Sequence, residues 1–159
     1  LTDGNPVVTS LLNAAPYLST SAALVAVGQS SDRSGKRFLH SAAALLAGAI
    51  GLAAVAPLAP TPQLAFAALV LSAAGIYAFY PPFWPIPQRM LAGVARAVAV
   101  GLINSVGNLG GFAGPYIVGY LNTLANSTYA GLIYLSGSAA LSSALLLAAR
   151  RYILRRHPS

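Results

Sequence analysis

Five stretches of this sequence are each long and apolar enough to cross a lipid bilayer as a helix. They cover residues 7–28, 38–56, 63–80, 91–121 and 128–149, and a helix needs about 20 mainly apolar residues to span the hydrocarbon. Charged residues make up only 7% of the chain, whereas a soluble domain has about 25%. So few charges cannot cover a surface that faces water. The sequence therefore predicts an all-α fold, a polytopic membrane bundle of five transmembrane helices surrounded by the lipid bilayer.

The connections between these stretches are too short to form a soluble domain. Residues 57–62 (PLAPTP) and 80–90 (YPPFWPIPQRM) are rich in proline, which ends helices, and residues 122–128 are polar and uncharged. The second of these segments contains Trp84 and suits a rigid turn at the level of the lipid headgroups. Residues 1–159 are therefore predicted to form a single transmembrane domain.

The basic residues all gather toward one side of the predicted membrane. The segments after the first, third and fifth spans face the same side, and they hold eight of the nine Lys and Arg residues. Arg96 lies just inside the fourth span, at the end nearest that side. Because cytoplasmic segments are enriched in Lys and Arg, residues 30–37 are predicted to be a cytoplasmic loop and residues 150–159 a basic cytoplasmic tail. The N-terminus is then predicted to lie outside the plasma membrane, or outside the inner membrane of a bacterium.

Several other functions are not supported by the composition. The net charge of +7 does not indicate nucleic-acid binding, because the basic residues lie at the ends of apolar runs and not on a face of a soluble fold. The chain has no cysteine, and His40 and His157 are far apart with no second ligand at a metal-binding spacing. No Ser–His–acid set or zinc-protease motif is present. We therefore predict no metal, no cofactor, no nucleic-acid partner and no enzymatic activity.

The first residues of the sequence indicate that the chain is a fragment of a longer protein. An N-terminus outside the membrane requires a signal sequence or preceding helices, and the first span is too long and too polar at its end to be a signal sequence. The chain starts with Leu1, and its only methionine is Met90. We therefore expect that upstream helices are missing.

One short segment contains an unusual density of charge for this chain. Residues 30–37 (SSDRSGKR) include Asp32, Arg33, Lys36 and Arg37. An ordinary cytoplasmic turn explains the basic residues, with Ser34 and Gly35 supplying the bend. It does not explain Asp32, one of only two acidic residues in the chain. Asp32 can accept hydrogen bonds from backbone N–H groups, or pair with Arg33 or with a basic residue of another helix.

This segment resembles the loop motif G-x-x-x-D-[RK]-x-G-[RK]-[RK] of the major facilitator superfamily. The matching residues are Gly28, Asp32, Arg33, Gly35, Lys36 and Arg37. The segments LLNAAPYL, FWPIPQRMLAG and GLINSVGNLGGFAGPYIVGYL resemble parts of its anion:cation symporter subfamily, whose members carry organic anions. The resemblance implies that the five spans are helices eight to twelve, a partial C-terminal transmembrane domain whose N-terminal half is missing. It also implies that Asp32 and Arg33 belong to a charge network that gates the outward-facing state.

Polar residues within two spans are candidates for substrate binding. Asn104 and Asn108 lie one turn apart on one face of the fourth span, and Asn13 and Tyr17 lie beside Pro16 in the first. Such side chains can bind the hydroxyl or carboxylate groups of a solute in a polar cavity. Alternatively, the asparagines form hydrogen bonds that join helices.

The fourth span also contains closely spaced glycines and one cation. Gly107, Gly110, Gly111 and Gly114 have the small-xxx-small spacing that allows helices to approach closely, so we predict a role in helix packing. Arg96 either extends its side chain to the nearby membrane surface or supplies a fixed charge for an anionic substrate.

Together with the resemblance, these features predict a secondary transporter that moves a small organic anion, such as a sugar acid or a dicarboxylate, by alternating access. Coupling to a proton or a cation is expected, although no span contains an acidic residue that could carry the proton. The alternative is a membrane scaffold or assembly subunit that does not transport and whose glycine-rich helix binds partner helices. The motif from Asp32 to Arg37 favours the transporter, because a scaffold has no need of it.

Overall fold

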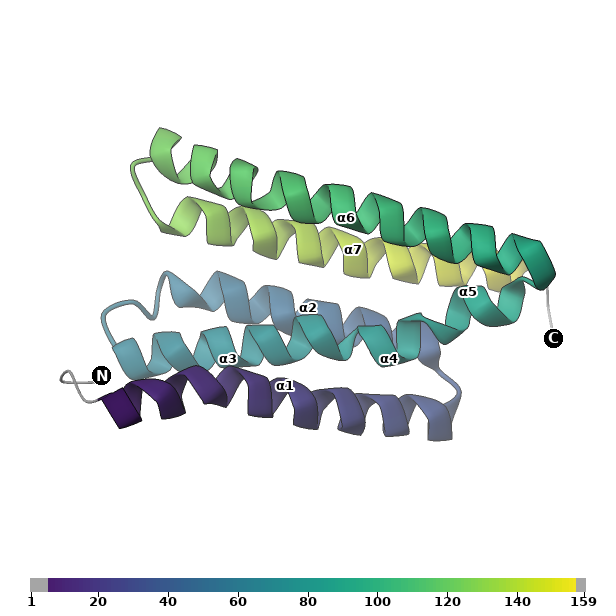
Figure 1. The fold of residues 1–159 in the computed structure, drawn as a ribbon, viewed down its shortest axis with the longest axis horizontal. Helices are drawn as coiled ribbons and strands as arrows, with labels where there is room; N and C mark the ends of the chain where they lie inside the picture. Colours follow the sequence, from purple (N-terminus) through teal and green to yellow (C-terminus); the bar gives the residue numbers. More distant parts are fainter. Residues whose placement is uncertain (1–5, 157–159) are drawn as a thin grey trace.

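The computed structural model describes residues 6–156, which form helices that lie side by side (Figure 1). In chain order the helices are α1 (Pro6–Ser34), α2 (Arg37–Val55), α3 (Pro62–Ala78), α4 (Tyr80–Phe83), α5 (Pro85–Met90), α6 (Gly93–Leu124) and α7 (Tyr129–Arg156). Five segments are long and apolar enough to cross a membrane, and α3, α4 and α5 together form one of them. The predicted all-α bundle with five spans is confirmed.

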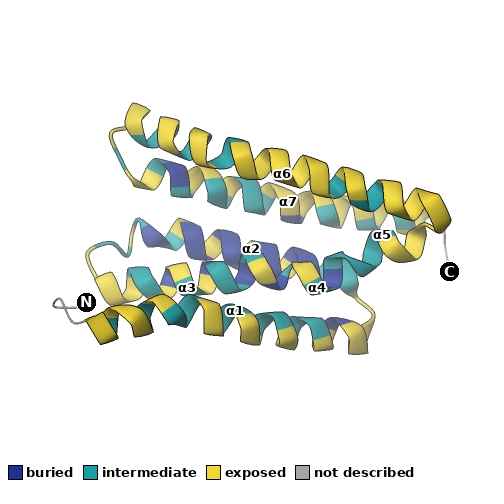
Figure 2. Ribbon diagram, viewed as in Figure 1, coloured by how far each residue is buried: buried dark blue, intermediate teal, exposed yellow. Residues whose placement is uncertain are grey.

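Helix α2 forms the centre of the bundle. It packs extensively against α3 on one side and α7 on the other, and α1 packs against α3. Small residues on α2 are buried along these contacts (Figure 2), including Ala42, Gly48 and Ala49. Two serines of α7 also reach α2: the Ser136 hydroxyl donates to the Ala49 carbonyl and the Ser143 hydroxyl to the Ala42 carbonyl, both at 2.8 Å.

Helix α6 lies at the edge of the bundle. None of its residues is buried, and it contacts mainly α7 and the short helix α5 (Figure 2). At its C-terminal end, the Asn122 side chain accepts a hydrogen bond from the Gly131 N–H at 2.8 Å and so joins α6 to the start of α7. Most of the surface of α6 is therefore available to lipid or to another helix.

The proline-rich segment 80–90 is helical, so the predicted rigid turn there is wrong. The N–H groups of Phe83 and Trp84 donate to the carbonyls of Phe79 and Tyr80, each at 3.2 Å, so the chain continues the direction of α3. Its prolines occupy the first positions of α4 and α5, where a missing N–H breaks no helical hydrogen bond. The chain instead turns at Leu91–Gly93, where Gly93 has a φ of +53°.

All nine Lys and Arg residues belong to segments at one end of the bundle. There α1 and α7 end, α2 and α6 begin, and α5 connects α3 with α6 (Figure 1). The turns at the opposite end, residues 56–61 and 125–128, contain no charged residue. This arrangement confirms the predicted separation of charge, while the side of the membrane that each end faces stays a prediction.

Candidate functional site

The charged motif spans the end of α1, a two-residue turn and the start of α2. The turn in the structure is therefore shorter than the loop predicted over residues 30–37. Helix α1 continues to Ser34, and only Gly35 and Lys36 lie between the helices. Gly35 has a φ of +68°, its N–H donates to the Ser31 carbonyl at 2.9 Å, and its carbonyl accepts from the Arg37 N–H at 3.0 Å. A glycine is favoured here because other residues adopt this backbone conformation with strain.

Asp32 forms an ion pair with Arg37 across this turn. The distance from its Oδ1 atom to the Arg37 Nη1 atom is 2.9 Å, so the partner is the basic residue of the next helix and not Arg33. The Arg37 side chain is 12% exposed and that of Asp32 is 68% exposed. A pair this accessible to water contributes about 1 kcal/mol or less to stability. The pair links the end of α1 to the start of α2 but contributes little to the stability of the fold.

Gly28, the first residue of the motif, lies where α1 packs against α4. A Cβ atom added to Gly28 would lie 3.2 Å from the Pro81 Cβ atom. The neighbouring Pro82 and two serines, Ser31 and Ser41, are completely buried. A side chain at Gly28 would require Pro81 or α1 to shift by a few tenths of an ångström.

A histidine that we did not connect with the motif also joins α1 to α2. The His40 Nε2 atom lies 3.0 Å from the Ser30 hydroxyl oxygen, and its Nδ1 atom lies 2.9 Å from the Lys36 carbonyl oxygen. Ser30 is on α1 and His40 on α2, so this contact supports the same turn as the Asp32–Arg37 pair. The sequence gives little indication of this contact, because Ser30 and His40 are ten positions apart.

The four predicted substrate-binding residues do not come together. Asn13 and Tyr17 lie on α1, Asn104 and Asn108 lie on α6, and all four are exposed. Helices α1 and α6 lie at opposite edges of the bundle (Figure 1). Within residues 6–156, the four residues therefore lie on two separate helices, and their role in substrate binding stays a prediction.

The close helix packing is between α2 and α3. A Cβ on Gly75 of α3 would lie 2.5 Å from the Gly48 nitrogen and 2.8 Å from the Ala44 carbonyl oxygen. Nothing lies within 4 Å of a Cβ added to the four glycines of α6 that we predicted to pack, Gly107, Gly110, Gly111 and Gly114. No described residue packs on these four, and their packing role stays a prediction that requires another helix. Small residues have the same spacing in α2 as in α6, so the sequence alone does not identify the observed contact.

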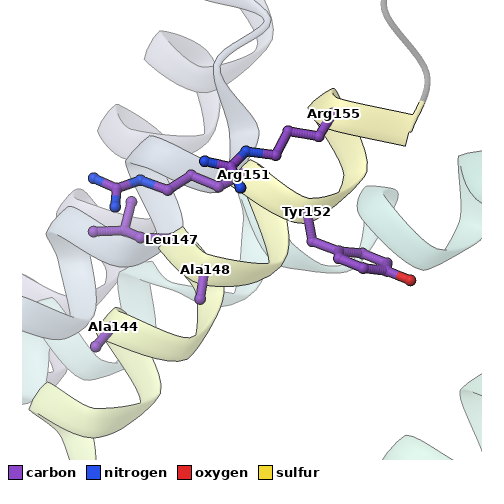
Figure 3. A pocket seen from close by; sticks show the side chains of 6 residues that line it. All are labelled: Ala144, Leu147, Ala148, Arg151, Tyr152 and Arg155. Carbon is purple, nitrogen blue, oxygen red and sulfur yellow. The ribbon is translucent and has the colours of Figure 1, made fainter.

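Arg96 and the C-terminal arginines lie at the basic end. The Arg96 Nε atom donates to the Leu91 carbonyl at 2.9 Å, which keeps its side chain beside the turn that precedes α6. The basic segment predicted as a tail begins inside α7, which extends to Arg156, and His157 lies outside the described residues. Six residues of this part of α7 line an open cavity of about 530 Å³ (Figure 3), namely Ala144, Leu147, Ala148, Arg151, Tyr152 and Arg155.

Comparison with known proteins assigns the chain to a family. Residues 2–159 match the model of the Major Facilitator Superfamily. The chain belongs to the Major Facilitator Superfamily. The family predicted from the motif is thus confirmed. No solved structure matches the chain.

Curated relatives of this superfamily member are named as transporters. It is 37% identical over 136 residues to a putative tartrate transporter of Agrobacterium vitis, a match that covers 86% of this chain and 30% of the relative. It is 33% identical over 133 residues to a quinolone resistance transporter of Acinetobacter baumannii, covering 84% of this chain and 30% of the relative. It is also 33% identical over 141 residues to the inner membrane transport protein RhmT of Escherichia coli, a match that covers 89% of this chain and 32% of the relative. The chain thus spans about a third of the length of these relatives.

Proposed function

We propose that this chain is part of a secondary transporter that moves a small organic anion, such as a dicarboxylate or a sugar acid, across the plasma membrane. Its membership of the Major Facilitator Superfamily supports transport. The observation that carries the substrate class is the similarity to two putative tartrate transporters, at 37% and 36% identity. Coupling to a proton or a cation belongs to the same proposal.

The substrate site of this transporter is proposed to need helices from a second half. Asn104 and Asn108 on α6 are exposed, as are Asn13 and Tyr17 on α1. Transporters of this kind bind their substrates between two helical halves near the middle of the membrane. Exposed amides on separate helices can contribute to such a site once further helices close the space between them.

The turn between α1 and α2 is proposed to act in gating. Asp32 and Arg37 form an ion pair across the turn, while Arg33 is exposed and available for a contact with another helix. An ion pair worth about 1 kcal/mol or less can break and re-form during alternating access without unfolding the helices. The alternative, a scaffold that binds partner helices through the glycines of α6, leaves this charged turn without a role.

We expect a chimera to transport tartrate. In it, this chain replaces the matching segment of the tartrate transporter of Agrobacterium vitis that is 37% identical. Tartrate uptake into proteoliposomes should exceed that of empty vesicles, because the chain supplies one wall of the site and the relative supplies the other. The 159-residue chain alone is the matched control and should give no uptake. A chimera that reaches the membrane but transports no dicarboxylate or sugar acid would contradict the proposed substrate class.

We expect the uncharged turns of the bundle to face outward. Single cysteines that replace Thr61 and Asn126 should react with an impermeant thiol reagent added to intact cells, whereas a cysteine at Ser34 should react only after the membrane is opened. The reason is that basic segments are retained on the cytoplasmic side. The chain has no native cysteine, so the background is low. Labelling of the cysteine at Ser34 in intact cells would contradict the proposed orientation, because it would place the basic end of the bundle outside.

A further inference from the structure

A small cavity at the basic end of the bundle combines positive charge with an apolar wall. Its volume is about 220 Å³, and it lies between the α1–α2 turn and the last turns of α7. Three cations, Lys36, Arg37 and Arg150, share its lining with three apolar side chains, Phe38, Ile153 and Leu154. We refer to it as the Lys36–Arg150 cavity. Two separate parts of the chain build it, so its shape depends on the packing of α2 against α7.

The charge of the Lys36–Arg150 cavity is not balanced within the described chain. Asp32 is the only carboxylate between residues 6 and 156, and it pairs with Arg37 at 2.9 Å. Within residues 6–156, Lys36 and Arg150 therefore have no carboxylate to pair with. Two adjacent cations repel each other, and an anion bound between them would remove that repulsion.

The apolar side chains restrict the kind of anion. Helix α2 begins and α7 ends beside the cavity, and both helices are long and apolar enough to cross a membrane. We therefore place the cavity near the depth at which phospholipid headgroups meet the hydrocarbon. Phe38, Ile153 and Leu154 offer surface to hydrocarbon, while Lys and Arg bind phosphate oxygens by charge-assisted hydrogen bonds. Basic pockets between helices at such a position are suited to anionic lipid headgroups.

We propose that the Lys36–Arg150 cavity binds the phosphate group of an anionic membrane phospholipid. Lys36 and Arg150 donate hydrogen bonds to the phosphate oxygens, and the apolar wall contacts the first part of an acyl chain. Because Lys36 precedes α2 and Arg150 belongs to α7, the bound lipid connects the gating turn with the C-terminal helix.

The other basic cavity at this end is less suitable. It contains Arg151 and Arg155, and their side chains extend from one side of α7 while Tyr152 points to the other (Figure 3). All six of its lining residues come from α7 alone. Such a groove on one helix attracts anions through its charge, but no second element fixes a headgroup there.

The test compares lipid binding to the chain and to three double variants by native mass spectrometry in detergent. The probes are phosphatidylglycerol, phosphatidylcholine and inorganic phosphate. Lys36→Gln with Arg150→Gln should weaken phosphatidylglycerol binding about thirtyfold, the equivalent of about 2 kcal/mol for two cations at a membrane surface. Arg151→Gln with Arg155→Gln removes the same charge from the neighbouring groove and should weaken binding less than about threefold. Lys36→Arg with Arg150→Lys keeps the charge and should retain binding, which separates loss of the site from loss of the fold.

The proposal is supported if the chain binds phosphatidylglycerol more tightly than phosphatidylcholine, and if this binding needs the charges of Lys36 and Arg150 but not those of Arg151 and Arg155. Equal weakening by the two glutamine variants would overturn it, because the attraction would then be a general effect of surface charge. Unchanged binding after Lys36→Gln with Arg150→Gln would also overturn it. Inorganic phosphate that displaces the lipid at millimolar concentration would show that the cavity takes free phosphate and would overturn the assignment to a membrane lipid.

Discussion

Gly75→Ala is expected to destabilise the bundle by about 3 kcal/mol, because the added methyl group would meet backbone atoms and not movable side chains. Its Cβ would lie 2.5 Å from the Gly48 nitrogen, 2.8 Å from the Ala44 carbonyl oxygen and 2.9 Å from the Gly48 Cα atom. Only a separation of α2 from α3 can relieve these contacts, and such a separation would also disturb the buried face of α2. Reversible unfolding in mixed micelles, followed by circular dichroism, measures the change in free energy of unfolding.

Gly101→Ala on α6 is the matched control for this substitution. It adds the same methyl group to a glycine inside a helix, but no atom of the described residues lies within 4 Å of the new Cβ atom. We expect the free energy of unfolding to stay constant or to rise by about 0.5 kcal/mol, since alanine favours the helix more than glycine does. If Gly75→Ala were no more harmful than Gly101→Ala, the close crossing of α2 and α3 would be contradicted.

The number of spans and the separation of charge could be predicted from the sequence because both depend on strong local signals. Apolar runs of about 20 residues have few alternatives to a transmembrane helix, and the basic residues at one end agree with a count of five. The bend at Gly35 was also predictable, since few residues other than glycine adopt its φ of +68°. The exact length of the turn could not be predicted, because Asp32 and Arg33 fit the last turn of a helix as well as they fit a loop.

The helix contacts could not be predicted, because many residues in this chain are small and apolar. Ala44 and Gly48 of α2 have the same small-xxx-small spacing as Gly107 and Gly111 of α6, yet of these three glycines only Gly48 meets another helix in the described chain. The helical course of residues 80–90 was missed for a related reason. Proline commonly ends helices, but Pro81 and Pro85 lie at the starting positions of α4 and α5, where their missing N–H is tolerated.

Asn104→Ala is expected to weaken tartrate binding ten- to a hundredfold in the chimera described above. Asn104 is exposed on α6 with Asn108 one turn away, so its amide can donate a hydrogen bond to a carboxylate of the substrate. Loss of a hydrogen bond to a charged group costs about 1.5–3 kcal/mol, which corresponds to that change in affinity. Isothermal titration calorimetry with the purified chimera gives the affinity, and thermal unfolding of the same sample gives the stability.

The control is Asn122→Ala on the same helix. Asn122 accepts a hydrogen bond from the Gly131 N–H at 2.8 Å, so its loss should lower stability and leave the affinity for tartrate unchanged. If Asn104 served only to join helices, Asn104→Ala would behave in the same way and would lower stability by about 0.6 kcal/mol, as is typical of such pairs in membranes. Unchanged affinity with reduced stability would therefore remove Asn104 from the proposed substrate site. Reduced affinity with unchanged stability would place α6 at the wall of the transport cavity.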